Sequence, residues 1–144
     1  MKARYISHWE VNMAKTKAEL LLRQRVRRKE NNNLDTRRYE KTKKGFLMRL
    51  YRNMQSRITG VQSLKAHLYV GKSLLPRSEF YEWAIDSPEF HELFDEWTNN
   101  NYDRKLTPSV DRVNSSIGYE LNNMEWVTHS ENSRRGAVSE RRTQ

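Results

Sequence analysis

Between residues 106 and 132 the chain carries side chains that can support metal or proton chemistry. The stretch reads LTPSVDRVNSSIGYELNNMEWVTHSEN and contains one aspartate, Asp111, one histidine, His129, and several asparagines. Hard divalent cations prefer oxygen ligands, and one such cation can stabilise charge on a scissile phosphate and on its leaving oxygen. Taken singly, each residue also has an ordinary interpretation. Asp111 can pair with Arg112 or Arg134, and the asparagines can be turn and cap residues.

A second group of potential ligands, His91, Glu92 and Asp95, lies in the stretch from Pro88 to Trp97. The group lacks the two-histidine spacing of a zinc-protease helix, so we interpret it as the solvated polar face of a helix. The chain has no cysteine, which excludes a disulfide framework and a cysteine-zinc site. The candidate chemistry therefore rests on the C-terminal stretch.

The positive charge of the chain is concentrated toward its N-terminus. The 144 residues carry a formal net charge of +9. Residues 1–60 hold 17 Lys and Arg against 5 acidic residues, residues 61–110 hold 5 against 8, and residues 111–144 hold 5 against 5. Such asymmetry suits a polyanion, because each neutralised phosphate releases condensed counterions. We therefore predict a nucleic-acid partner, against the alternatives of a solvated basic helix, an acidic protein or a membrane surface.

Two basic helices are expected in the N-terminal half. Residues 13–28 lack Gly and Pro and are rich in good helix formers, and their positive residues outnumber their apolar ones. Three asparagines at 31–33 then mark a linker. From about Lys43 to Ile58 apolar residues recur at spacings of three and four, which predicts a helix with a core face that ends near Gly60. The candidate DNA contacts on these helices are Arg23, Arg25, Arg27, Arg28, Lys43, Lys44, Arg49, Arg52 and Arg57.

The middle of the chain is predicted to be scaffold. A short helix is expected to start near Ser78, and Ser87-Pro88 is typical of an N-cap followed by proline at the first helical position. The apolar residues that follow recur at i, i+3, i+4 and i+7, which places them on one buried helix face. They are Phe90, Leu93, Phe94 and Trp97.

The stretch from 106 onward has a different pattern. Residues 114–118 are turn signals, and the β-prone residues on either side predict two short strands. After Thr128 the chain becomes polar, and Thr128 or Ser130 can cap a helix that runs to about Arg135. The predicted fold class is therefore α+β, a mostly helical N-terminal and middle region followed by strand, loop, strand and helix.

This order and these residues resemble the HNH endonucleases, particularly the free-standing and intron-encoded kind of phages. The family motif runs Asp-His, a turn, Asn-apolar-x-Trp-Val-Thr and a final Asn or His. The chain supplies Asp111, then NMEWVT at 123–128, then Asn132. The match is close over residues 106–132, and residues 39–97 are similar, less diagnostically, to the upstream part of small phage HNH proteins. The resemblance implies a ββα-metal hairpin and helix.

The resemblance also implies a role for each residue. Asp111 and Asn132 would be the protein ligands of one Mg²⁺ or Mn²⁺ ion. Asn123 would hold the hairpin in shape and orient its catalytic neighbour, while the pair Trp126-Val127 would pack the hairpin on the helix. Two arginines at the end of the motif complete the candidate DNA contacts, namely Arg134 and Arg135.

The chain departs from the family at Arg112. The family has there a histidine that takes a proton from the attacking water, and an arginine with a pKa above about 12 cannot do so at neutral pH. Three explanations stay open: an inactive site kept for DNA binding, a substitute base such as His129, or metal-bound water with Arg112 clamping the phosphate. Asp-Arg variants with a following Gly-Tyr turn, here Gly118-Tyr119, resemble phage nucleases, which favours activity.

We therefore expect a metal-dependent DNA endonuclease that nicks or cuts duplex DNA. The alternatives are a catalytically inactive HNH-like DNA-binding protein and a protein that binds structured RNA. The expected organisation is a basic N-terminal helix or arm at 1–38, a helical scaffold with a DNA-contacting basic helix at 39–105, the HNH-like motif at 106–136 and a flexible tail at 137–144.

No apolar run approaches the roughly 18 to 20 residues that span a bilayer, and the N-terminus lacks a signal-peptide apolar region. We expect a cytoplasmic protein without a membrane partner, in the bacterial host cell if the chain is phage-encoded. The sequence leaves the oligomeric state open between monomer and homodimer.

Overall fold

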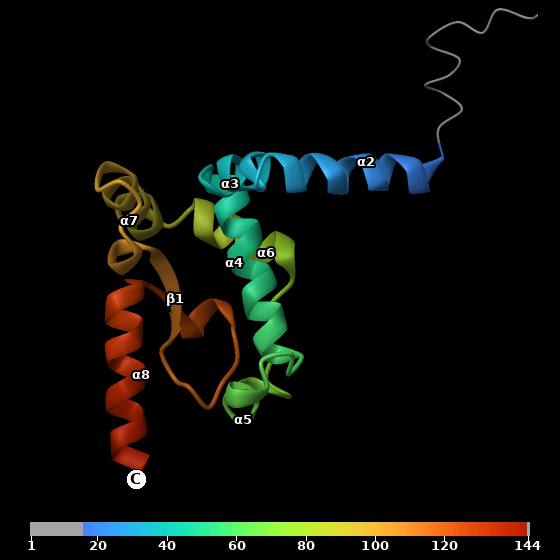
Figure 1. The fold of residues 1–144 in the computed structure, drawn as a ribbon. Helices are drawn as coiled ribbons and strands as arrows, with labels where there is room; N and C mark the ends of the chain where they lie inside the picture. Colours follow the sequence, from blue (N-terminus) through green and yellow to red (C-terminus); the bar gives the residue numbers. More distant parts are fainter. Residues whose placement is uncertain (1–15, 144) are drawn as a thin grey trace, which may run out of the picture. The chain divides into compact units, whose positions relative to one another are not determined.

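The computed structural model describes residues 16–143, with side chains described through residue 138 (Figure 1). This part of the chain is mostly helical, with seven α-helices and one small antiparallel sheet of two strands near the C-terminus. The predicted α+β class is confirmed at this level. The chain divides into two compact units, Met1–Thr42 and Lys43–Gln144. From the sequence we placed boundaries after residues 38, 105 and 136.

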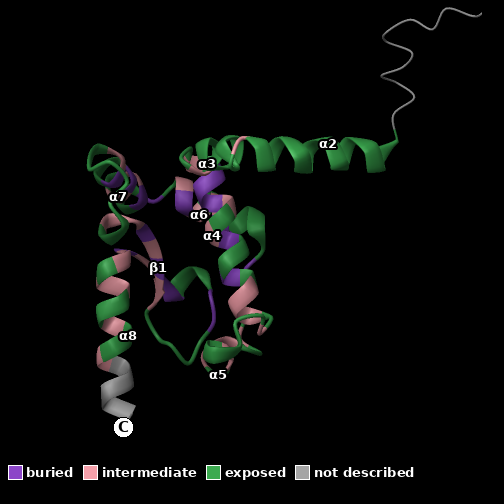
Figure 2. Cartoon of the chain, viewed as in Figure 1, coloured by how far each residue is buried: buried purple, intermediate pink, exposed green. Residues whose placement is uncertain are grey.

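The first unit contains helix α2 (Lys17–Glu30) and helix α3 (Leu34–Glu40). Thr16 begins α2 with a capping box, because its Oγ1 accepts from the Glu19 amide at 3.2 Å and its own amide donates to the Glu19 carboxylate at 3.0 Å. The helix predicted over 13–28 is thus confirmed from Lys17 onward, while residues 13–15 lie outside the described part. Every residue of α2 is exposed (Figure 2).

Helix α3 was not expected from the sequence. The predicted break is present, because Asn32 and Asn33 adopt the left-handed region with φ of 52° and 60°. The chain then resumes as a helix of two turns without a buried residue. Local polar contacts hold its start: Asn31 Nδ2 donates to Asp35 Oδ2 at 3.2 Å, and Arg27 pairs with the same carboxylate at 3.0 Å. Such short polar helices leave no apolar periodicity to read.

The second unit contains five helices, three 3-10 turns and the hairpin. The order is α4 (Lys43–Ile58), η1 (Ser63–Lys65), α5 (Ala66–Tyr69), α6 (Arg77–Ile85), α7 (Pro88–Asn99), η2 (Arg104–Leu106), β1 (Pro108–Arg112), η3 (Leu121–Asn123), β2 (Met124–Thr128) and α8 (His129–Thr143). The predicted helix over Lys43–Ile58, the short helix near Ser78 and the helix from Pro88 are confirmed.

One apolar core joins α4, α6, α7 and the hairpin. On α4, Leu47 and Met54 are fully buried, two turns apart on the face that the spacing predicted. The aromatic residues of α7 pack against Phe46, whose ring lies 6.2 Å from that of Phe90 and 5.1 Å from that of Trp97. Since Val110 of β1 and Met124 of β2 belong to the same core, the scaffold and the hairpin form one packed body.

The hairpin is antiparallel, with Pro108 opposite Thr128 and Arg112 opposite Met124. Trp126 lies on the face that meets the core, where its ring stacks on Trp83 of α6 at 5.4 Å and 12° and contacts Phe90 of α7 at 4.8 Å. Trp126 therefore fastens the hairpin to α6 and α7, whereas the sequence analysis assigned it to the following helix. The difference arises because side chains alternate along a strand, which puts Val127 on the opposite face, toward α8.

The loop between the strands docks on the segment that follows α5. Tyr119 N donates to Ser73 O at 2.8 Å, and Leu75 N donates to Tyr119 O at 3.0 Å. Gly118 permits this approach, because a Cβ at that position would lie 2.1 Å from Ser73 O. Tyr119 is 1% exposed, so the loop is part of the folded body.

Thr128, one of the two predicted caps, precedes helix α8, and its Oγ1 accepts from the Glu131 amide at 3.2 Å. The helix extends to Thr143, beyond the end predicted near Arg135, so residues 137–143 that the sequence analysis assigned to a tail lie within a helix. The sequence AVSERRT after Gly136 contains good helix formers, which carry the helix past the glycine. Across residues 16–143, no helix is both long and apolar enough to cross a bilayer.

Candidate functional site

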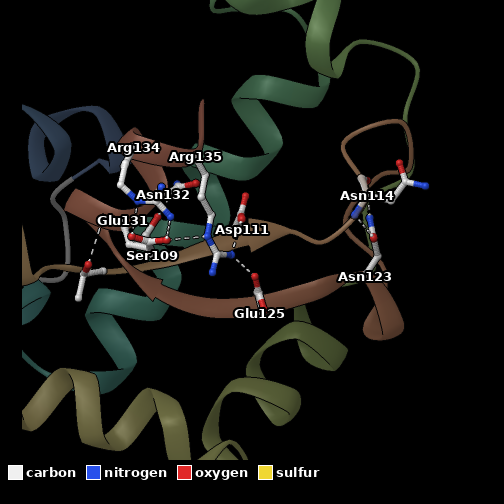
Figure 3. Close-up of polar contacts among 10 residues, drawn as sticks. Ser109, Asp111, Asn114, Asn123, Glu125, Glu131, Asn132, Arg134 and Arg135 are labelled. Atoms are coloured by element: carbon white, nitrogen blue, oxygen red, sulfur yellow. Dashed lines mark hydrogen bonds and ion pairs between the residues drawn. The ribbon is translucent and has the colours of Figure 1, made fainter. Parts of the chain in front are cut away.

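The candidate site lies where α8 packs on the outer face of the hairpin (Figure 3). The contacts advance along β1 and α8 together. His129 N donates to Thr107 O at 2.8 Å, Asn132 Nδ2 donates to Ser109 Oγ at 3.0 Å, and Arg135 Nη1 donates to Asp111 Oδ2 at 3.0 Å. Helix and first strand therefore run in the same direction, and each turn of α8 faces the next outward side chain of β1.

Arg135 is the centre of this interface. Its Nη1 pairs with Asp111 and also with Glu125, the residue directly opposite Asp111 in the strand register. Its Nε donates to Glu131 Oε1 at 3.0 Å, one helical turn earlier. These hydrogen bonds, first that of Asp111, raise the pKa of Arg135 above its ordinary value. One guanidinium thus bridges carboxylates from β1, β2 and α8.

Glu131 binds a second arginine as well. Arg134 donates to both of its carboxylate oxygens, from Nε at 2.9 Å and from Nη2 at 2.6 Å. Hydrogen bonds from Arg134 and then from Arg135 lower the pKa of Glu131 from 4.5 to about 2. Arg134 and Arg135, which were predicted to contact DNA, therefore pair with acidic residues of the protein itself.

The two residues that the resemblance implies as metal ligands face the same interface. Asp111 lies on β1 and is half-buried, with its side chain 22% exposed. Asn132 lies on α8. Its Nδ2 donates to Ser109 Oγ, so its Oδ1 is the amide atom that is not engaged with Ser109. The contact that Asp111 makes is with Arg135, three residues or about 4.5 Å along the helix from Asn132.

Among the residues whose placement is described, no group of three or more His, Asp or Glu side chains is arranged to hold a metal ion. Arg135 occupies the space between the three carboxylates in this conformation. Asp111 and Asn132 therefore form at most a two-ligand set, which suits Mg²⁺ more than Zn²⁺ because Mg²⁺ keeps several waters and binds substrate phosphate.

The substitute base considered from the sequence, His129, is not brought to Asp111. It is the first residue of α8 and lies beside Thr107, six residues before Arg135, which is about 9 Å along a helix. Its imidazole makes no hydrogen bond to another described residue.

Arg112 lies on the opposite side of the hairpin from Asp111, since neighbours along a strand point to opposite faces. Its Nη1 donates to the backbone oxygens of Leu68, Ser115 and Ile117 at 3.1, 3.0 and 3.3 Å. Its guanidinium carbon lies 4.2 Å from the centre of the Tyr69 ring. The position that holds the family's base is thus occupied by a group that links α5 to the hairpin loop.

Asn123 ties the loop to itself and is 6% exposed. Its Nδ2 donates to Asn114 O at 3.0 Å and to Gly118 O at 2.8 Å, while its Oδ1 accepts from Asn114 N at 2.8 Å. All of these partners are backbone atoms of the loop. The geometry matches the shape-holding role that the resemblance implies, and the contacts do not include the Arg112 side chain.

The basic candidates outside the motif differ in their surroundings. On α2, Arg23, Arg25 and Arg28 are exposed, and Arg27 is also exposed but pairs with Asp35. On α4, Lys43 Nζ lies 2.8 Å from His91 Nδ1, and that imidazole also contacts Ile85 O at 2.7 Å, so His91 is not simply solvated as predicted. The remaining candidates of α4 are Lys44, Arg49 and Arg52, which are exposed, and Arg57, which is half-buried.

Sequence reasoning did not single out Ser109, Glu125 or Glu131. A signal for them exists. The alternation of β1 places Ser109 on the face of Asp111, and the spacing of three and four between Glu131 and the two arginines predicts helix ion pairs. Glu125 required the strand register, which depends on the loop length and on how the loop folds.

The chain was compared with protein-family models, with curated protein sequences and with solved structures, and nothing in any of the three matches it.

Proposed function

We propose that this protein binds duplex DNA and cleaves it with one divalent metal ion, as an endonuclease of the HNH type. One observation carries the proposal. The chain folds as strand, loop, strand and helix, and Asp111 of β1 and Asn132 of α8 lie on the two surfaces that pack together. That is where a ββα-metal motif holds its ion, and Asn123, directly before the second strand, organises the loop, as the resemblance implies.

The donor chemistry of these residues fits Mg²⁺ or Mn²⁺. Asp111 contributes a carboxylate and Asn132 an amide oxygen, and both are hard oxygen donors. A bound ion would supply stabilisation of charge on the scissile phosphate and the leaving oxygen. Arg135 holds Asp111 Oδ2 at 3.0 Å, so a metal ion would bind through Asp111 Oδ1 or would take Oδ2 in place of Arg135. In either case Arg135 would lie beside the site, where a guanidinium can pair with phosphate.

The remaining residues position the DNA and the loop. Asn123 fixes the loop backbone, and Arg112 anchors that loop to α5. The exposed arginines of α2 and α4 attract and orient the phosphate backbone without reading its sequence. Because arginine keeps its proton at neutral pH, Arg112 does not act as the base that activates water.

A second function, duplex DNA binding without cleavage, is favoured by one specific observation. The described groups that surround Asp111 are Arg135 and, across the strands, Glu125, while Arg112 and His129 both lie away from it. A site that has lost its base and has placed an arginine between its acids is what a retained, inactive HNH scaffold would contain.

Cleavage of supercoiled plasmid distinguishes the two functions. The purified protein is incubated with plasmid in Mg²⁺, in Mn²⁺ or in EDTA, beside the variant Asp111→Ala. The matched control is Asp95→Ala, which removes an exposed aspartate from α7. An endonuclease nicks the plasmid with either metal, not in EDTA, and loses this activity in Asp111→Ala alone while still binding DNA.

Two other results are informative in the same experiment. Tight plasmid binding without nicking in any metal supports the inactive DNA-binding protein and removes the endonuclease. Nicking that persists in Asp111→Ala removes Asp111 from the site.

A further inference from the structure

Arg112 and Lys72 are two cations that bind the same pair of backbone oxygens. Arg112 Nη1 donates to Leu68 O at 3.1 Å and to Ser115 O at 3.0 Å. Lys72 Nζ donates to the same Leu68 O and to Ser115 O at 2.7 Å. The two positive groups are therefore within a few ångströms of each other, between α5 and the hairpin loop. Burial and the charge of Arg112 lower the pKa of Lys72 accordingly.

A third cation, Arg57 of α4, joins them through two tyrosines. Its guanidinium lies 5.8 Å from the centre of the Tyr69 ring, which Arg112 approaches at 4.2 Å. Its Nη1 donates to the Tyr119 hydroxyl at 3.2 Å, and the rings of Tyr69 and Tyr119 stack at 6.3 Å with 9° between their planes. Arg57 and Arg112 thus converge on one aromatic pair, and Lys72 joins them through the backbone oxygens that it shares with Arg112.

No carboxylate neutralises this cluster among the residues that the structure describes. None of the ion pairs found there includes Arg57, Lys72 or Arg112, and the nearby Glu120 accepts from Ser73 Oγ at 2.7 Å. Carbonyl dipoles and tyrosine faces offset part of the repulsion. Three unpaired cations at one place still favour an anion, and all three side chains are only half-buried, so an anion can reach them.

We propose that Arg57, Lys72 and Arg112 form a subsite for one backbone phosphate of duplex DNA, on the face of the hairpin opposite Asp111. The choice of DNA rests on the proposed function. A phosphodiester group offers two non-bridging oxygens that share one negative charge, which suits a guanidinium and an ammonium held side by side. A phosphate bound here would neutralise the cluster and stabilise the loop that carries Asn123, on the side of the motif away from the acids.

The test is the salt dependence of binding to a duplex of about 20 base pairs, followed by fluorescence anisotropy. The variants are Lys72→Gln and Arg57→Gln, and Lys105→Gln is the matched control, since it removes an exposed positive charge from η2. The slope of log K against log salt is negative, and each lost phosphate contact reduces its magnitude by about 1. We expect this loss in Lys72→Gln and in Arg57→Gln, and a wild-type slope in the control.

The conservative variant Lys72→Arg separates charge from a structural role. Lys72→Arg keeps the positive charge, whereas Lys72→Gln keeps N–H donors without the charge. A phosphate contact therefore survives Lys72→Arg and is lost in Lys72→Gln, whereas a lysine that only holds Leu68 O and Ser115 O gives no such difference in the salt slope. Thermal unfolding gives a second readout, because inorganic phosphate should raise the Tm of the wild type more than chloride at equal ionic strength, and should do so less in Lys72→Gln.

The outcomes keep this subsite distinct from the proposed function. Wild-type binding to duplex DNA with equal slopes in Lys72→Gln and Lys105→Gln overturns the subsite and leaves DNA binding in place. Failure of the wild type to bind the duplex at any salt concentration overturns DNA binding itself. A phosphate effect on Tm that is equal in wild type and Lys72→Gln also overturns the subsite.

Discussion

Arg135 sets the charge of the interface between hairpin and helix. It bridges Asp111, Glu125 and Glu131, which come from three different elements. Three carboxylates around one guanidinium give a local charge that a divalent cation could also neutralise. Under the proposed function, a metal ion bound by Asp111 and Asn132 would take over part of the charge compensation that Arg135 provides.

We predict that Arg135→Gln makes the stability of the protein dependent on divalent metal. Without the guanidinium, the charges of Asp111 and Glu125 face each other without compensation. The free energy of unfolding in EDTA should then fall by roughly 1 kcal/mol, since these pairs are partly exposed. Mn²⁺ should then raise the Tm of Arg135→Gln more than that of the wild type. Thermal unfolding with EDTA and with Mn²⁺ measures both effects.

The control for this prediction is Arg134→Gln, which removes an arginine that binds Glu131 without touching Asp111. An equal response of both variants to Mn²⁺ would contradict a metal site at Asp111. An unchanged Tm of Arg135→Gln in EDTA would show that the bridge contributes nothing to stability.

The lowered pKa of Glu131 predicts that the stability of the protein depends on pH with a definite sign. This pKa is about 2 in the folded protein, against 4.5 ordinarily, because Arg134 and Arg135 bind the charged form of Glu131. A lowered folded pKa gives stability that is present above pH 4.5 and is lost as the pH falls toward 2. We therefore expect Glu131→Gln to lower stability at pH 6 and to make the free energy of unfolding less steep between pH 5 and pH 2. Urea unfolding across this range checks it, with Glu89→Gln, an exposed acid of α7, as the control.

At the scale of single residues, the sequence predicted which segment carries the candidate site but not which side chains contact Asp111. The spacing of Asp111, Asn123 and Asn132 predicted a hairpin followed by a helix, and Asp111 does lie on β1, Asn123 directly before β2 and Asn132 on α8. The partner of Asp111 and the environment of Arg112 depend on contacts with α8 and α5, which are distant in sequence. Local spacing carries no information on such contacts.

At the scale of elements, the hairpin loop depends on a close approach between two backbone segments. Residues 118–119 lie against residues 73–75, with hydrogen bonds from Tyr119 N to Ser73 O and from Leu75 N to Tyr119 O. Asn123 closes the same loop from within. The loop that follows the first site strand is thereby fixed to the scaffold, which keeps β1 in a single position relative to α8.

We predict that Gly118→Ala destabilises this docking. The added Cβ would lie 2.1 Å from Ser73 O and 2.4 Å from Ser73 N, both backbone atoms, so the segments must separate. Overpacking of this kind costs roughly 1–3 kcal/mol. Chemical denaturation should show this loss, and hydrogen exchange should show faster exchange of the Tyr119 and Leu75 amides. The control is Gly136→Ala, where a Cβ has no neighbour within 4 Å. Equal stability of the two variants would contradict the docking.

The elements with an apolar period were predictable from it, whereas α2 was predictable from its composition alone and α3 was not predicted. The face of α4 with Leu47 and Met54, and that of α7 with Phe90 and Phe94, follow from spacings of three and four. Helix α3 has no buried residue that would produce such a period, and neither do the described residues 136–138 of α8. Their helical form follows from local capping and intrinsic propensity, which are weaker signals.

At the scale of the whole chain, the charge is distributed so that the site is not its most basic part. Residues 1–60 carry a net charge of +12, whereas the acids of the candidate site are already paired with Arg134 and Arg135. Helix α2 buries no residue, so its cations contribute little to folding. Under the proposed function, the affinity for DNA comes mostly from α2 and α4, and the hairpin contributes the chemistry.

This division predicts that the cations of α2 control DNA affinity and leave stability unchanged. The variant Arg23→Gln, Arg25→Gln, Arg28→Gln removes three exposed charges and spares Arg27, which pairs with Asp35. If all three arginines contact phosphates, the magnitude of the negative slope of log K against log salt decreases by about 0.9 for each, or roughly 2.7 in total. The Tm should stay at its wild-type value, because the helix packs no side chain into a core. Anisotropy titrations at several salt concentrations measure the slope.

An unchanged slope would mean that α2 is a solvated basic helix and that the protein binds DNA through α4 and the hairpin alone. A lower slope together with a lower Tm would instead mean that α2 also supports the fold, through contacts that its exposure does not reveal.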